Sequence, residues 1–168
     1  MRGRVLHALG RVQQTYDPKG EVDLVARSGA LAMYGLGTTA LVTAVRASGR
    51  LPKRLEVADL ILGGIATHKF ARLVTKSSVA APIRAPFTEF VECSGPSEHN
   101  EVPRHDNHVQ HAIGELLTCP FCLGVWVGTA YVAALTVSPR GARAWAAVFT
   151  VTALADTMQH LYDALKAD

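Results

Sequence analysis

The sequence predicts an all-α membrane protein with about four transmembrane helices in two hairpins and one long polar loop. The chain has 168 residues, of which 49% are hydrophobic and 18% charged, whereas about 25% of a typical soluble domain is charged. The apolar residues form four blocks of about helix length, and lysines and arginines stand at the block ends. This composition argues against a disordered chain. The net charge of +3, without a basic face interleaved with aromatic residues, argues against nucleic-acid binding.

The first transmembrane span is expected over residues 29–47, within a membrane domain formed by residues 28–168. Residues 29–45 contain no charged side chain, and Arg27 and Arg46 flank them. Such a block nearly matches a hydrocarbon layer of ~30 Å at ~1.5 Å per residue. The preceding residues 1–27 are basic and lack an uninterrupted apolar stretch, so we expect a short interfacial helix rather than a cleavable signal peptide.

The second span is expected over residues 55–75 and is less apolar than the first. His68 and Arg72 lie one helical turn apart and share a face with Lys76, which must contact protein or lipid headgroups. Residues 76–115 are then expected to form the long polar loop, because two prolines break the helix and four histidines follow.

The third span is expected over residues 116–138, which carry no charge, and the fourth over residues 142–163. Asp156 and His160 lie one turn apart on the fourth span and, with His68, are candidate intramembrane polar residues. They indicate either a proton or ion pathway or a helix that has already left the membrane at His160.

The distribution of basic residues predicts the orientation. With four spans, 11 of the 17 lysines and arginines lie on the side of both termini and the long loop. Because cytoplasmic flanks collect Lys and Arg, we expect both termini on the cytoplasmic side of a bacterial inner membrane.

Three segments carry a family resemblance: GELLTCPFCLGVWVGTA (residues 114–130), HKFARLV (68–74) and APIRAPF (81–87). Together they resemble domain-of-unknown-function family 1360, a family of small bacterial integral membrane proteins that includes a sporulation protein. The resemblance implies a membrane protein of unestablished activity and supplies no catalytic residue.

The Cys-Pro-Phe-Cys motif is the sharpest chemical feature of the sequence. Pro120 suits a first helical turn, which places Cys119 at a helix N-terminus, where a thiol pKa is lowered. Three interpretations remain: packed structural thiols, a thiol-redox pair, or a metal site. The metal site would bind zinc or another transition metal; otherwise no cofactor is expected. Its candidate ligands are Cys93, Cys119, Cys122, His108 and His111.

Glu115 begins the third span and needs a basic partner at the membrane interface, for which Arg72 and Arg84 are the candidates.

Gly124 and Gly128 form a GxxxG motif on the same span and are expected to let helices approach within the bundle.

The expected function is a scaffold or partner-binding subunit without an enzyme active site. Its partners would be the lipid bilayer and a membrane protein or a second copy of the chain. The alternative is a membrane metal-binding or thiol-redox protein that uses Cys119, Cys122 and Cys93. A further alternative is a small transporter or proton-coupled subunit built on the intramembrane polar residues.

Overall fold

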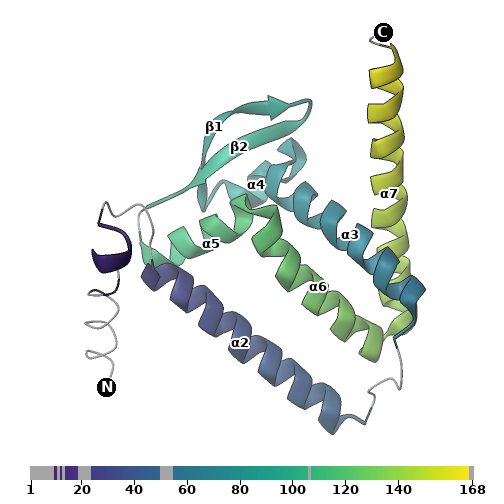
Figure 1. Cartoon of the computed structure of the whole chain (residues 1–168), viewed down its shortest axis with the longest axis horizontal. Helices are drawn as coiled ribbons and strands as arrows, with labels where there is room; N and C mark the ends of the chain where they lie inside the picture. The colour runs from purple at the N-terminus through teal and green to yellow at the C-terminus, as the bar shows by residue number, and fades with distance from the viewer. Residues whose placement is uncertain are drawn as a thin grey trace.

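The computed structural model describes residues 10, 12, 14–18, 24–49, 55–105 and 107–166, and these are mostly helical (Figure 1). The expected N-terminal interfacial helix lies largely outside the described residues. The long helices are α2 (Leu24–Ala47), α3 (Val57–Lys76), α6 (Pro120–Val137) and α7 (Pro139–Lys166). Between α3 and α6 lie the 3₁₀ turn η1 (Ser78–Ala80), α4 (Ala81–Arg84), β1 (Thr88–Gly95), β2 (Glu98–Pro103) and α5 (His108–Thr118).

The centre of the bundle is α3, which packs against both α6 and α7, while α2 packs against α5 and α6 (Figure 1). Small side chains allow the close approach of α3 and α7, because Ala66, Ala142 and Ala146 are buried there. Tyr131 and Leu135 of α6 complete this core. The hydroxyl group of Tyr131 donates a hydrogen bond to the carbonyl oxygen of Asp59 at 2.9 Å.

Three glycines of α3 and α6 face a neighbouring helix, and two of them form the predicted GxxxG motif. A Cβ atom at Gly63 would overlap the ring of Tyr131. Gly124 and Gly128 lie against Thr67 of α3, where a Cβ atom would meet the Thr67 methyl group at 4.0 and 3.8 Å. These glycines therefore bring α6 close to α3.

The segment 76–115 is folded, which corrects the prediction of a polar loop and of an all-α chain. Strands β1 and β2 form an antiparallel hairpin, and α5 packs against β2. Hydropathy does not predict the hairpin, because β1 is mostly exposed and β2 is polar and half-buried. The tertiary structure pairs charged side chains of β2, such as Glu101 with Arg84. We call η1, α4, β1, β2 and α5 together the cap.

The third apolar block is also divided, since α5 ends at Thr118 and α6 begins at Pro120. Cys119 between them has extended backbone angles (φ −109°, ψ 104°), and Pro120 has no N–H to continue the α5 hydrogen bonds. By length and composition, α2 and α6 are the helices of the described chain that are apolar enough to cross a membrane. Helices α3 and α7 are long but less apolar, so two of the four expected spans meet this criterion.

Candidate functional site

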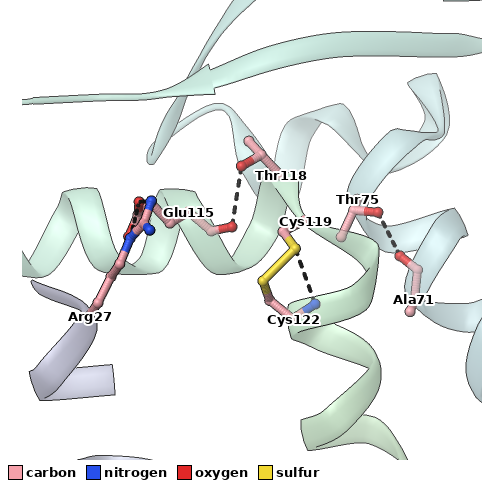
Figure 2. The surroundings of a disulfide bond; sticks show 7 residues. All are labelled: Arg27, Ala71, Thr75, Glu115, Thr118, Cys119 and Cys122. Carbon is pink, nitrogen blue, oxygen red and sulfur yellow. Dashed lines mark hydrogen bonds and ion pairs between the residues drawn. A yellow bond between two sulfur atoms is a disulfide. The ribbon is translucent and has the colours of Figure 1, made fainter. Parts of the chain in front are cut away.

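The two cysteines of the motif lie at the corner where α5 meets α6 and are joined by a disulfide bond (Figure 2). Their Cα atoms are 5.3 Å apart. Cys119 is the N-cap residue of α6, and its Sγ accepts a hydrogen bond from the backbone N–H of Cys122 at 3.1 Å. The same N–H would stabilise a thiolate at Cys119 after reduction. Cys119 thus lies at a helix N-terminus with a backbone donor on its sulfur.

Glu115 lies one turn before this corner and binds Arg27 of α2 (Figure 2). The Arg27 Nη2 and Nε atoms donate to Glu115 Oε1 at 2.8 and 3.1 Å. The predicted partners of Glu115 were therefore wrong: Arg72 binds Glu98 at 2.7 Å, and Arg84 turns into the cap. The cause is the folding of the cap, whose strand β2 supplies nearer carboxylates to both arginines.

Arg84 is the largest fully buried side chain of the described residues, and it binds Glu101 through two hydrogen bonds of 2.9 and 2.5 Å. Its Nη1 also donates to the carbonyl oxygens of Val74 and Ser77, both at 2.8 Å. The Thr88 hydroxyl donates to Glu101 Oε2 at 2.6 Å. One guanidinium group therefore ties β2 to the C-terminal end of α3.

The electrostatics of Glu101 follow from these contacts. Burial raises the pKa of the Glu101 carboxyl group, but the hydrogen bonds from Arg84 and Thr88, together with the positive charge of Arg84, outweigh burial. Its pKa therefore lies below the ordinary value of a glutamate, and the pair remains ionised in the folded cap.

The candidate metal ligands are not brought together. Cys93 is an exposed free cysteine on β1, where it faces His99 of β2. His111 is buried, with its Nδ1 atom 3.1 Å from the Arg104 carbonyl oxygen and its ring stacked on His105, whereas His108 is exposed. No group of three or more His, Cys, Asp or Glu side chains within the described part of the chain is arranged to hold a metal ion.

The candidate intramembrane polar residues are also dispersed. Asp156 of α7 binds Lys69 of α3, while His68 and His160 are exposed. At the opposite end of these two helices, Arg143 of α7 binds both carboxylate oxygens of Asp59 at 2.8 Å. The sequence analysis missed this second pair, because its members are 84 residues apart and only the packing of α3 on α7 joins them.

A pocket of about 640 Å³ lies beside the disulfide, between α2 and the α5–α6 corner. Tyr34 of α2 and Trp126 of α6 meet in its wall, with ring centroids 5.1 Å apart and an edge-to-face arrangement. The Tyr34 hydroxyl oxygen lies 2.7 Å from Thr129 Oγ1. Sequence reasoning missed this pocket, since the position of α2 against α6 has no local signal.

The fold and the site define a small, mostly helical protein with two helices apolar enough to cross a membrane and a disulfide at the head of one of them. The chain belongs to the family described as protein of unknown function (DUF1360), whose model matches residues 62–162. This match confirms the family resemblance of the sequence and covers the cap, α6 and most of α3 and α7, but not α2.

The chain is similar to the sporulation protein YjcA of Bacillus subtilis (strain 168), with 28% identity over 104 residues. The alignment covers 61% of this chain and 88% of that protein. No solved structure matches the chain.

Proposed function

We propose that the protein is a multi-pass protein of the bacterial inner membrane in which α2, α3, α6 and α7 all cross the bilayer. One observation carries this proposal: each of the four long helices turns large apolar side chains outward. So many exposed large apolar side chains are uncommon in soluble monomers and typical of a lipid or protein contact. The exposed side chains are Leu31, Met33, Leu36, Val42, Leu60, Ile61, Val125, Val132, Val148, Val151 and Leu154.

The ion pairs between helices are consistent with this arrangement. Arg143–Asp59 lies near the N-terminal ends of α7 and α3, whereas Lys69–Asp156 and Arg27–Glu115 lie toward the end that carries the cap. Charged side chains within helical membrane proteins are tolerated when they are paired or near the interface. The excess of basic residues on the cap side favours a cytoplasmic location for the cap and both termini.

Charged substitutions at outward-facing positions test whether α3 and α7 cross the membrane. Val151 is 64% exposed on α7, and Gly64 on α3 has open space beside it, so arginine at either position disturbs no packing. On an aqueous surface such changes shift stability by about 0.5 kcal/mol or less. In the middle of a span they cost ~2.5–3.5 kcal/mol. We expect Val151→Arg and Gly64→Arg to lose membrane accumulation.

The matched control is His160→Arg, because His160 is exposed near the C-terminal end of α7. It is expected to accumulate normally, as measured by immunoblotting of carbonate-washed membranes. Normal accumulation of Val151→Arg and Gly64→Arg would remove α7 and α3 from the set of spans.

For the cap of this membrane protein, we propose a scaffold or partner-binding role. Strand β1 pairs with β2 along one edge, and the described residues place no strand against its other edge. Phe90 and Val91 of this strand are exposed. Unpaired edge strands accept a partner strand through backbone hydrogen bonds.

A photoreactive residue at Val91 should give one discrete cross-linked product in cells, and the same residue at Val148 should give none. Absence of a product at Val91 contradicts this role.

A second candidate function is thiol-disulfide chemistry, and the disulfide at the α6 N-terminus is the observation that favours it. On the cytoplasmic side, disulfides are usually transient and either catalytic or redox-sensing. Acid trapping and alkylation of cells is therefore expected to find Cys119 and Cys122 partly oxidised, in a fraction that rises with added oxidant. Cys93 is the internal control and should stay reduced. A pair that never oxidises would eliminate this candidate.

A further inference from the structure

The pocket beside the disulfide places the Cys119–Cys122 pair in the wall of an apolar, aromatic cavity. Both sulfur-bearing residues line it, next to the facing rings of Tyr34 and Trp126. Its volume of about 640 Å³ lies within the ~300–1,000 Å³ that small-molecule sites occupy. Leu31 and the Arg27–Glu115 ion pair also line it.

The pocket opens toward the outer surface of the bundle. Leu31 lies in its wall and is 72% exposed on α2. In the four-span arrangement proposed above, this face of α2 lies near the membrane interface, one turn from the Arg27–Glu115 ion pair. A lipid-soluble molecule can therefore reach the two cysteines without crossing water.

We propose that this pocket binds a membrane quinone, which accepts electrons from the Cys119–Cys122 pair. A quinone is flat and apolar, and it suits the faces and edges of the Tyr34 and Trp126 rings. It also supplies an oxidant inside a compartment whose soluble thiol pools keep cysteines reduced. This inference rests on the thiol-redox candidate function and adds its electron acceptor.

The reaction balances with the quinone as the sole co-reactant. The two S–H bonds of Cys119 and Cys122 break, one S–S bond forms, and the pair loses two electrons and two protons. The quinone gains both electrons, and each of its carbonyl oxygens becomes a hydroxyl group of the hydroquinone. Cys119 is the thiol favoured to lose its proton first, because the N–H of Cys122 already points at its sulfur.

The test uses the full chain in lipid nanodiscs, reduced with dithiothreitol and then freed of it without air. Decylubiquinone is the first oxidant, and the water-soluble hydroxyethyl disulfide is the second. Quinone reduction is followed by ultraviolet absorbance, and thiol loss by the mass added by a maleimide. We expect one quinone reduced per protein, with both thiols lost from Cys119 and Cys122. Cys93→Ser should behave as wild type, whereas Cys119→Ser and Cys122→Ser should not reduce the quinone.

Two tryptophan variants at exposed positions of α2 test whether the quinone reacts from within the pocket. Leu31→Trp fills it, and Leu36→Trp adds the same bulk at an exposed α2 position that does not line it. We expect Leu31→Trp to slow oxidation by the quinone at least about tenfold, with the rate for hydroxyethyl disulfide unchanged, and Leu36→Trp to change neither rate.

The outcomes separate the two proposals. Equal quinone rates in Leu31→Trp and wild type, or no quinone reduction while hydroxyethyl disulfide still oxidises the pair, would overturn the quinone site and leave the thiol-redox function standing. A pair that neither oxidant converts to a disulfide would overturn both.

Discussion

At the scale of single residues, the buried Arg84–Glu101 ion pair is the main polar contact that stabilises the cap. The exposed fractions of the two side chains are 0% and 5%. Taking both charges out of water is expensive, and it is compensated here because Arg84 also bonds two carbonyl oxygens and Glu101 accepts from Thr88. Removing one member would leave the other charge buried and unpaired, at a cost of ~3–5 kcal/mol. The pair therefore decides whether β2 stays docked on α3.

The lowered pKa of Glu101 predicts acid sensitivity of the cap. Because the folded pKa lies below the unfolded one, ionised Glu101 stabilises the folded cap above about pH 4.3. This contribution is lost as the pH falls from there through the lower folded pKa. Hydrogen exchange of the β2 amides, corrected for the intrinsic rate, should therefore show protection that falls in this range.

Glu101→Gln is expected to show weaker β2 protection at neutral pH and no further loss on acidification. Glu89→Gln is the control, since Glu89 is exposed and 3.9 Å from Arg104. The Glu89→Gln variant should lose β2 protection over the same pH range as wild type. An unchanged acid transition in Glu101→Gln would assign the sensitivity to another group.

At the scale of elements, the packing of α5 beneath the hairpin depends on Gly114. A Cβ atom there would lie 2.5 Å from the Phe87 carbonyl oxygen and 2.9 Å from Pro103 Cβ. Both neighbours are held by the hairpin and its preceding turn, so neither gives way as a flexible side-chain end would. This close approach holds α5, which leads into the α5–α6 corner, against the hairpin.

Gly114→Ala is therefore expected to destabilise the protein by ~1–3 kcal/mol, because the added methyl group must displace α5. Gly64→Ala is the matched control, since Gly64 is also helical but has open space around it. It should be neutral or stabilising by up to ~1 kcal/mol through helix propensity. Thermal unfolding of the detergent-solubilised protein measures both. Equal melting temperatures for the two variants would contradict the close approach at Gly114.

At the scale of the whole molecule, the cap and the C-terminal end of α7 lie at one end of the bundle (Figure 1). The C-terminal end of α2, the N-terminal end of α3 and the α6–α7 connection lie at the other. Four crossings would place these two ends on opposite faces of the membrane. The basic residues of the cap end then predict that this end is cytoplasmic.

Cysteine labelling of intact cells tests this orientation. In a background without the native cysteines, a membrane-impermeant maleimide should label Ser48→Cys and Arg140→Cys, which precedes the fourth span and is exposed. It should miss Asn100→Cys until the cells are permeabilised. Labelling of Asn100→Cys alone would invert the orientation. Labelling of all three positions in intact cells would contradict a membrane domain that separates the two ends.

Much of the helical layout was predictable from local pattern. The charge-free block of residues 29–45 lies within α2, and the Cys-Pro step marks the start of α6. These features depend on neighbouring residues, through hydropathy over one helix or the dihedral preference of proline. The candidate site was partly predictable for the same reason, since the Cys119–Cys122 spacing on a helical turn already brings the two sulfurs near each other.

The partners of the charged side chains were not predictable in this way. Glu115 binds Arg27, 88 residues away, and Arg84 binds Glu101 only because the register of the hairpin places that carboxylate beside α4. The sequence by itself determined which segments are apolar helices and which family the chain belongs to. The tertiary structure alone decided the folded cap, the ion pairs and the pocket between α2 and α6. These depend on packing between distant segments, and no local preference of the chain encodes which of several available charges or helix faces will meet.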